Sequence, residues 1–248
     1  MYIDLTDQVA LVTGSAKRVG RAIALELAKK GVHIMVHYNS SHDDSVRDTI
    51  HEIKSFGVDA FAVQADISTT DGVSKIFTEV ETHFDRLDIL VNSASLFHQN
   101  NLMNTTLEDW RKSLDVNLTG AFLCTQSAVH LMRENKPTGG AIINILDYGA
   151  VQPWVERADH SVSKAGLLML TKISAASLGK ENIRVNGVLP GPVLRDEANS
   201  EERWAKIGET LPIGRTGNPE DVGRAVVYLA QESFVTGTVL KVNGGEDL

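Results

Sequence analysis

Short apolar runs alternate with longer amphipathic segments along the whole chain. The runs rich in β-branched residues have strand length and predict strands at Val9–Thr13, Val32–Val36, Ala60–Val63, Ile89–Asn92, Ala141–Leu146, Val185–Leu189 and Val239–Val242. The segments with a helical period predict helices at Val19–Lys29, Asp43–Phe56 and Gly72–His83, around Trp110–Met132 and Ser161–Leu178, and at Pro219–Ala230. Seven strands separated by helices predict a doubly wound α/β fold, in which one parallel sheet is covered by helices on both faces.

Length and periodicity together predict a single domain. A chain of 248 residues with 42% hydrophobic content can bury one large core, so residues 1–248 are expected to form one unit. The stretch Gly191–Ser200 has no clear period. We therefore expect a mobile loop over the substrate within residues 191–210.

The charge balance makes some partners improbable. The chain has 24 basic and 32 acidic residues, a net charge of −8, and its Lys and Arg residues form no stripe that could neutralise a phosphate backbone. No apolar run approaches the roughly 18 residues of a membrane span, and Asp4 and Asp7 stand where a signal peptide would carry positive charge. We expect a cytoplasmic protein that binds neither nucleic acid nor membrane. The single cysteine, Cys124, lies among apolar residues and is expected to be a buried small hydrophobe.

A short glycine-containing turn follows the first predicted strand and opens the first helix. It reads Thr13-Gly14-Ser15-Ala16-Lys17-Arg18-Val19-Gly20. Gly14 permits a tight turn and Gly20 lets the helix approach the strand, so the free N–H groups at the start of the helix can face a pyrophosphate. A strand-to-helix turn with two glycines can also be only a turn, and the rest of the chain favours the dinucleotide interpretation.

Seven landmarks share the order and the spacing of one enzyme family. They are the Thr13–Gly20 turn, Asp66-Ile67, Asn92-Ser93-Ala94, Asn117, Ser163-Lys164, Pro190-Gly191 and Val242-Asn243-Gly244-Gly245. Over its whole length the chain therefore resembles the short-chain dehydrogenase/reductases. The resemblance implies one Rossmann-like domain that binds a nicotinamide cofactor and a small-molecule substrate. It also implies a homotetramer or homodimer, and the apolar residues Leu167, Leu168 and Leu170 and the ending Lys241–Leu248 are compatible with such contacts.

The end of the second strand bears on which nicotinamide cofactor binds. A carboxylate at this point takes the ribose hydroxyls of NAD, whereas the 2′-phosphate of NADP needs positive charge and hydrogen-bond donors. Here the strand ends in Asn39, Ser40 and Ser41, and the neighbouring turn supplies Lys17 and Arg18. We expect NADP(H), with a plain polar loop as the alternative interpretation. The cofactor contacts implied by the resemblance are Gly14, Lys17, Arg18, Val19, Gly20, Asn39, Ser40, Ser41, Asp66, Ile67, Asn92, Ser93, Ala94, Lys164, Pro190, Gly191 and Val193.

Three departures from the common family pattern point to one branch. Arg18 stands where most members have glycine, Ser95-Leu96-Phe97 follows the fourth strand, and Asp147 stands where the family usually has its catalytic serine. Together they resemble the pteridine reductase branch, which includes dihydromonapterin-type reductases. In that branch Phe97 would stack a flat ring against the nicotinamide, and Ser95 and Arg18 would make polar contacts near the pyrophosphate. Packing of Phe97 beneath the lip of the site is the alternative.

The residue at the family's tyrosine position is His160. It lies four residues before Lys164 in a helical pattern, so the two side chains share a face. The resemblance implies that Lys164 holds the nicotinamide ribose and that Asn117 kinks its helix near the lysine. A carboxylate stabilises imidazolium, so Asp147 and His160 together form a credible general acid. A neutral His160 that merely occupies the place, or Tyr148 as the donor, remains open.

Aromatic residues flank the predicted substrate side. Trp154 and Arg157 lie between Asp147 and His160, and Trp204 follows the Gly191–Ser200 stretch, although either tryptophan could simply pack. Leu194 replaces a polar residue of the family, which leaves the backbone of Val193 for the carboxamide of the cofactor.

These residues support three hypotheses about function. The chain is expected to be an NADP(H)-dependent oxidoreductase acting on a flat pterin-like or carbonyl substrate through Asp147, His160, Lys164 and Asn117, without a metal. A catalytically silent NADP(H)-binding protein, acting as a sensor or a structural subunit, is the main alternative. A reductase of activated double bonds is the third.

Overall fold

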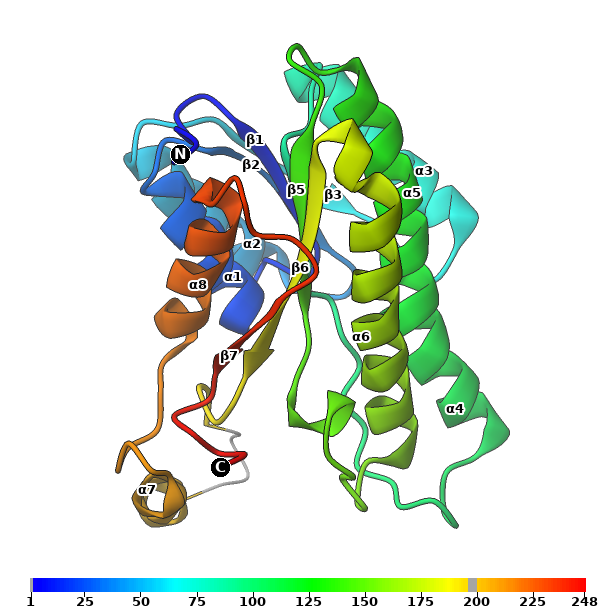
Figure 1. Ribbon diagram of the computed structural model, residues 1–248, viewed down its shortest axis with the longest axis vertical. Coiled ribbons are helices and arrows are strands. Elements are labelled where there is room, and N and C mark those ends of the chain that lie inside the picture. The colour runs from blue at the N-terminus through cyan, green and yellow to red at the C-terminus, as the bar shows by residue number, and fades with distance from the viewer. Residues whose placement is uncertain (1, 196–199) are drawn as a thin grey trace.

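The computed structural model describes residues 2–195 and 200–248, and it contains one parallel sheet. Its strands are β1 (Val9–Val12), β2 (His33–Tyr38), β3 (Ala60–Gln64), β4 (Ile89–Asn92), β5 (Gly140–Ile145), β6 (Ile183–Pro190) and β7 (Val239–Val242). They lie in the order β3-β2-β1-β4-β5-β6-β7 (Figure 1). Every pair of neighbouring strands is parallel, which confirms the predicted fold class.

Helices cover both faces of this sheet. They are α1 (Arg18–Ala28), α2 (Asp43–Ser55), α3 (Thr70–Phe84), α4 (Leu107–Leu114), α5 (Gly120–Glu134), α6 (Ala158–Leu178), α7 (Glu201–Thr210) and α8 (Pro219–Gln231). Figure 1 shows α1, α2 and α8 on one side of the sheet and α3, α4, α5 and α6 on the other. None of the helices in these residues is both long and apolar enough to cross a bilayer.

Alternating residues of each strand enter the two halves of the core. In β1, Ala10 and Val12 pack under α1 and α8, whereas Val9 and Leu11 pack under α3 and α5. Successive side chains of a strand point to opposite faces, so a short fully apolar run is what a sheet buried on both sides requires. Cys124 is fully buried in the second half of the core, as predicted, and burial raises the pKa of its thiol to about 12.

The strand order reverses between β1 and β4, and this reversal creates the place for a ligand. The chain first builds β1, β2 and β3 outward to one edge and then returns to β4 beside β1. In open parallel sheets ligands bind outside the carboxyl ends of the strands at such a reversal. These ends lie at the lower side of the molecule in Figure 1.

Two helical regions differ from the sequence expectation. The helix expected around Trp110–Met132 starts at Leu107 and changes to a π-helical segment at Asp115–Thr119 before α5 begins. The loop expected within residues 191–210 is shorter than that, because Glu201–Thr210 form α7, capped by the Ser200 hydroxyl. Residues 196–199 of this loop lie outside the described residues, and its mobility stays a prediction.

The apolar side chains of α6 lie in two groups. Leu167, Leu168 and Leu170 pack inward, in a cluster with Leu146 and Leu189 from the sheet. The large hydrophobic side chains that α6 exposes are Val162, Met169 and Ile173. Leu168 and Leu170 are only half-buried in the cluster, and whether these residues serve subunit contacts stays a prediction.

Candidate active site

The predicted phosphate turn is tightly packed against the end of β4. Gly14 has a left-handed φ of 66°, and a Cβ added there would lie 2.9 Å from Ala94 Cα. A Cβ on Gly20 would lie 2.3 Å from the Gly14 carbonyl oxygen, so only glycine fits both positions without a shift of the backbone. The Thr13 hydroxyl accepts hydrogen bonds from the N–H groups of Ser93 (2.9 Å) and Ala94 (3.0 Å).

A buried histidine supports the same turn from β2. His37 is 1% exposed, and its Nδ1 accepts a hydrogen bond from the Gly14 N–H at 3.1 Å. Its Nε2 faces the Ala65 carbonyl at 3.0 Å and must carry the ring proton to donate there. Burial lowers the pKa of His37, against weaker opposition from the bond to Ala65 and the charge of Asp66. The ring is therefore neutral, in the tautomer that joins the turn to β3.

The residues expected around a 2′-phosphate lie at the surface beside this turn. Lys17, Arg18, Asn39 and Ser40 are exposed and Ser41 is half-buried, while the Asn39 carbonyl accepts a hydrogen bond from Gln64. Arg18 opens α1 with a left-handed φ of 57°, a conformation that glycine adopts more readily than arginine.

Three further expected cofactor contacts, Asp66, Ile67 and Asn92, lie at or just after the carboxyl ends of their strands. Asp66 is exposed and accepts hydrogen bonds from the N–H and the hydroxyl of Ser68, whereas Ile67 is buried. Asn92 at the end of β4 donates to Asn144 across the sheet at 2.8 Å. These contacts fix the backbone next to the turn, where the resemblance places the cofactor.

The π-helical segment presents Asn117 to the loop that follows β4. The Asn117 side chain accepts from the Leu96 N–H at 2.7 Å and donates to the Leu96 carbonyl at 3.0 Å. It also donates to the Ser163 hydroxyl at 2.9 Å. Asn117 thus holds both backbone polar groups of Leu96 against α6. It lies next to Lys164, but without a direct bond to it among the described contacts.

Asp147 and His160 form a hydrogen-bonded pair, as the sequence predicts. The Nε2 of His160 faces an Asp147 carboxylate oxygen, and its Nδ1 lies 2.8 Å from the Leu96 carbonyl oxygen. Nδ1 also lies 3.4 Å from the Asn117 amide nitrogen, so it faces one acceptor and one donor. A ring that donates to both Asp147 and Leu96 is the doubly protonated imidazolium. The His160 side chain is 2% exposed and that of Asp147 is 20% exposed, so Asp147 is the more accessible residue of the pair, although its Oδ1 is itself buried.

Lys164 lies one helical turn after His160, and its charge acts on the same carboxylate. Its ammonium is buried and donates to the Ile145 carbonyl at 2.8 Å. Burial lowers the pKa of Lys164, partly opposed by the charge of Asp147. Burial alone would raise the pKa of Asp147, but the bond from His160 and the charges of Lys164 and His160 together lower it. Asp147 is therefore ionised, between two groups that can be cationic.

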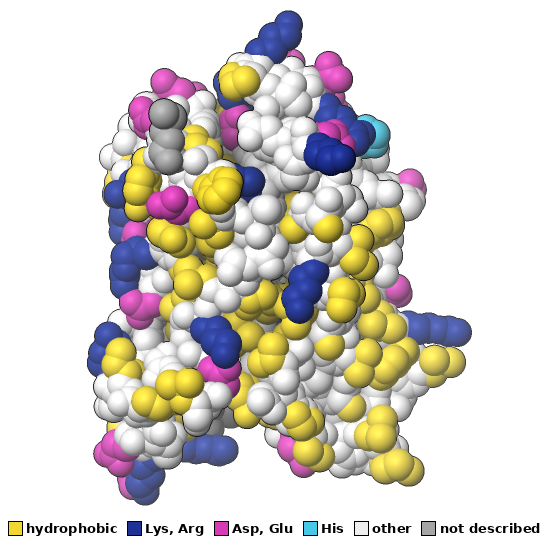
Figure 2. Space-filling view, viewed as in Figure 1, with side chains coloured by type: hydrophobic (Ala, Val, Ile, Leu, Met, Phe, Trp, Pro, Cys, Tyr) yellow, Lys and Arg dark blue, Asp and Glu magenta, His cyan; other side chains and the backbone are white. Residues whose placement is uncertain are grey.

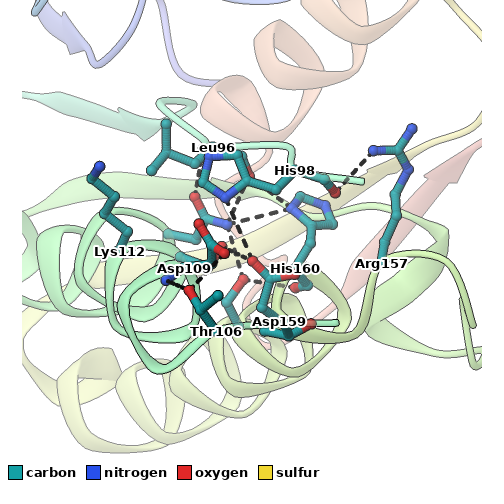
Figure 3. Close-up of polar contacts among 12 residues, drawn as sticks. Leu96, His98, Thr106, Asp109, Lys112, Arg157, Asp159 and His160 are labelled. Carbon is teal, nitrogen blue, oxygen red and sulfur yellow. Dashed lines mark hydrogen bonds and ion pairs between the residues drawn. The ribbon is translucent and has the colours of Figure 1, made fainter. Parts of the chain in front are cut away.

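The loop after β4 is fastened to the start of α6 through His98 (Figure 3). The Arg157 guanidinium donates to the His98 carbonyl at 3.0 Å, and the His98 ring lies 3.7 Å from a carboxylate oxygen of Asp159. Asp159 is fully buried and also accepts a hydrogen bond from the Ser113 hydroxyl of α4. Because Leu96 belongs to the same loop, these contacts also fix the carbonyl that His160 faces.

Aromatic side chains gather over the Asp147–His160 pair. The Phe97 ring is 46% exposed and lies edge-to-face with His160, at 4.8 Å between centroids, and with Trp154, at 5.4 Å. The Arg157 guanidinium covers one face of Phe97 at 3.6 Å from the ring centroid. Tyr148 meets the Trp154 ring at 6.5 Å and makes no described contact with Asp147 or His160. The Phe97 ring is nevertheless about half exposed, so a flat ligand can reach it.

The structure does not unite all of the predicted substrate residues. Trp204 lies in α7, and no ring contact joins it to Phe97 or Trp154 within the described residues. Ser95 is exposed, and its hydroxyl lies 3.3 Å from the Leu96 carbonyl. Pro190 ends β6, the Gly191 N–H donates to the Val242 carbonyl, and Val193 is buried against the core.

The residues present fit a dinucleotide in the crevice. The first N–H groups of α1, from Arg18 and Val19 onward, have no partners within the helix, and they open beside a glycine cradle that a Cβ would fill. Asn92 ends β4, and Gly191 follows β6 at the same edge of the sheet. Lys164 lies on α6 and reaches the end of β5. Phosphates can therefore bind at the turn and a nicotinamide ribose at Lys164.

The sequence reasoning missed two residues of this region. His37 belongs to an otherwise apolar strand, and a polar residue at a fully buried strand position was the signal that could have found it. Glu246 follows Gly244-Gly245 in the tail, and its buried Oε2 has no hydrogen-bond partner. Nothing in the local sequence indicates that position, because it depends on how the tail folds back toward β6.

Comparison with known proteins supports the family that the sequence motifs resemble. A family model described as enoyl-(acyl carrier protein) reductase matches residues 14–246. The 3β-hydroxysteroid dehydrogenase 1 of Eggerthella lenta is 36% identical over 255 residues, covering 100% of this chain and 97% of that protein. A 3-oxoacyl-(acyl-carrier-protein) reductase of Staphylococcus aureus is 36% identical over 240 residues, covering 95% of this chain and 96% of the relative.

Solved structures agree with these relatives in fold. Acetoin dehydrogenase YohF of Salmonella typhimurium has a TM-score of 0.87 at 30% identity and covers 97% of this chain and 96% of its own. A mutant of a Serratia marcescens short-chain dehydrogenase/reductase has a TM-score of 0.90 at 30% identity, with 99% and 100% covered. The phosphate turn, the order of the strands and the relatives all agree. The chain therefore belongs to the short-chain dehydrogenase/reductase family of oxidoreductases.

Proposed function

We propose that the protein is an NADP(H)-dependent reductase of a flat pterin-like or carbonyl substrate, with Asp147, His160 and Lys164 as its reacting centre. The observation that carries this proposal is the hydrogen-bonded Asp147–His160 pair beside the buried ammonium of Lys164. The resemblance places the family's proton donor at His160, and the pair holds a proton there. The bound cofactor would supply a hydride.

Surface charge beside the turn favours the phosphorylated cofactor. Lys17 and Arg18 are exposed next to the end of β2, and the Asn39–Ser41 segment carries no acid. A 2′-phosphate placed there would meet cations and hydroxyl donors, whereas no carboxylate is at hand for the ribose hydroxyls of NAD. Lys164 would hold the nicotinamide ribose.

The geometry suggests the route of the proton. His160 Nδ1 is committed to the Leu96 carbonyl, so the transferable proton is the one between Nε2 and Asp147. Asp147 is the more exposed of the two, and a substrate oxygen would meet its carboxyl group first. The proton therefore leaves His160 through Asp147 as the substrate oxygen becomes negative, and the imidazole ends neutral.

The aromatic cluster supports a flat substrate of the pteridine reductase type. The Phe97 ring is 46% exposed, and the Arg157 guanidinium over one of its faces keeps the ring in place. The names of the relatives point instead to a ketone or an acyl thioester. Both classes present a polar double bond that accepts a hydride and a proton, so a test must include both.

A substrate panel tests the proposal. NADPH oxidation would be followed with dihydropterin, 3-ketosteroid, 3-oxoacyl thioester, diketone and enoyl thioester substrates, for wild type and Asp147→Ala. We expect turnover with at least one substrate and its loss in Asp147→Ala, whereas His130→Ala, at an exposed histidine of α5, should match wild type. Tight NADPH binding without turnover, together with turnover gained in His160→Tyr, would refute the proposal and support a silent cofactor-binding protein.

We also propose that the protein assembles as a homodimer or homotetramer through α5 and α6. Val162, Met169 and Ile173 of α6 and Phe122 of α5 are exposed. Figure 2 shows hydrophobic side chains gathered over this side of the molecule. Sedimentation of wild type and Ile173→Glu would test it, because a charge in a shared apolar contact dissociates the subunits.

A further inference from the structure

The last residues of the chain return to the end of β6. Gly244 and Gly245 have left-handed φ values of 64° and 86°, which reverse the chain after β7. This reversal brings Glu246 against Gly191, where a Cβ added to the glycine would lie 2.8 Å from Glu246 Oε2. Gly191 follows β6 directly, and its N–H donates to Val242 in β7. The carboxyl group of Glu246 therefore lies at the carboxyl ends of the strands.

The same edge of the sheet carries Asp147. β5 and β6 are neighbours, and the Leu146 N–H donates to the Val188 carbonyl just before Asp147. Glu246 Oε2 and Asp147 Oδ1 are both buried from solvent without a well-formed hydrogen bond, although the Gly149 N–H approaches the Asp147 carboxyl group closely enough to lower its pKa. Most buried polar groups in proteins are paired, so two unpaired carboxyl oxygens at one ligand-binding edge indicate groups whose partners arrive with a ligand.

The pKa values of the two carboxyl groups are shifted in opposite directions. Burial raises the pKa of Glu246, and the negative charges of Asp247 and Asp147 raise it further. The pKa of Asp147 is lowered by its bond from His160 and by the charges of Lys164 and His160, against the effect of burial. Two neighbouring acids whose pKa values are pushed apart can serve as one neutral donor and one anion in the same site.

We propose that Glu246 is a further catalytic residue, a neutral carboxyl group that donates a hydrogen bond to the substrate atom that receives the proton. The proposal rests on the proposed reductase function. The hydride forms the new C–H bond, the π electrons move to the substrate oxygen or nitrogen, and the Asp147–His160 pair supplies the proton. Glu246 keeps its own proton and polarises the double bond, and such a donor is worth more in the transition state than in the ground state.

Variants of Glu246 test this role against a neighbouring control. Glu246→Leu removes the donor and should lower kcat at least tenfold, with the Kd for NADPH within about twofold of wild type. Glu246→Gln keeps an N–H donor and should recover much of the loss. Asp247→Asn alters the adjacent carboxyl group, which pairs with Lys241, and should leave kcat at its optimum unchanged.

The pH profile separates catalysis from a structural role. As pH rises and Glu246 ionises, the wild type should lose kcat, because the anion cannot donate and is repelled by the charge of Asp147. The nearby charges of Asp247 and Lys241 pair with each other. Glu246→Gln should lack this limb. Its stability relative to wild type should also rise with pH, because a raised folded pKa means that the wild type loses stability above the ordinary carboxyl pKa of 4.5.

The outcomes distinguish the two proposals. A wild type that turns over no substrate would overturn the reductase function and this role with it. A wild type that turns over substrate, with Glu246→Leu retaining kcat and Glu246→Gln retaining the alkaline limb, would overturn the role of Glu246 alone. If Glu246→Leu does not fold, the pH profile of Glu246→Gln decides.

Discussion

Arg18→Gly tests both the strain and the cofactor preference of the phosphate turn. Arg18 has a φ of 57°, in the left-handed region, and its side chain is exposed without a hydrogen bond or ion pair among the described contacts. The substitution therefore removes a strained backbone position and one positive charge, and it leaves the packing of the turn almost unchanged. The two effects can be measured separately.

The stability effect follows from the backbone angle. A residue with a Cβ in the left-handed region costs about 1–2 kcal/mol relative to its ordinary conformation, and glycine avoids that cost. Glycine also gives the unfolded chain more freedom, which costs about 0.4–1 kcal/mol. The net gain is between about 0 and 1.6 kcal/mol, centred near about 0.8 kcal/mol. In a domain of this size about 1 kcal/mol corresponds to a rise in Tm of roughly 2–4 °C.

The cofactor effect follows from the charge. A unit charge at contact distance from a phosphate in water is worth about 1 kcal/mol, or about a fivefold change in Kd. Arg18→Gly should therefore weaken NADPH binding about fivefold and leave NADH binding nearly unchanged. The difference should shrink as salt is added, because exposed charges are screened.

Arg18→Ala is the matched control, because alanine removes the charge and keeps the left-handed strain. Fluorescence titration with both cofactors and thermal denaturation of the three proteins complete the assay. We expect both variants to bind NADPH about fivefold more weakly and only Arg18→Gly to gain Tm. Equal effects on NADPH and NADH would refute the 2′-phosphate reasoning, and equal Tm values for the two variants would refute the strain reasoning.

Three further predictions concern the turn and the reacting pair. His37→Leu leaves the Gly14 N–H and the Ala65 carbonyl unpaired and should cost about 1–3 kcal/mol in urea denaturation; failure of His37→Asn to recover any of it would contradict the assigned bonds. Gly20→Ala forces a Cβ against the Gly14 carbonyl. It should lower the free energy of unfolding by about 1–3 kcal/mol and NADPH affinity at least tenfold. Gly179→Ala is the control, because its Cβ meets nothing within 4 Å. The folded pKa of Asp147 is lowered, so its contribution to stability is complete above the ordinary pKa of 3.8 and is lost as pH falls below it; an advantage over Asp147→Asn that is constant down to pH values well below this would show that the pair is not ionic.

The fold was predictable because each element carries its own local signal. The strand β1 reads as an unbroken apolar run, and a sheet covered on both faces requires such runs. The helix α7 was missed because it is short, mostly exposed and polar. Its signal was the Ser200 cap followed by Glu201 and Glu202, which is a local feature that a search for hydrophobic period overlooks.

The residues of the predicted reacting centre, Asp147, His160 and Lys164, lie together in the structure because their spacing in the sequence fixes their geometry. Lys164 follows His160 by one helical turn, and Asp147 follows the strand beside that helix, so the fold itself brings the three residues together. The contacts of His37 and Glu246 depend instead on residues distant in sequence. Gly14 meets His37 through the pairing of β1 with β2, and Glu246 meets Gly191 through the pairing of β6 with β7. No local pattern records such pairs.

The histidine at position 160 can be understood only together with its two acceptors. A phenol has one proton to donate, whereas imidazolium has two and requires an acceptor on each side when it is buried. Asp147 provides one acceptor, and the Leu96 carbonyl, held by Asn117, provides the other. Asp147 and His160 therefore act as one chemical unit, because the carboxylate stabilises a second proton on the ring. The negative charge of Asp147 also favours the neutral form of a second acid nearby, and Glu246 is that acid.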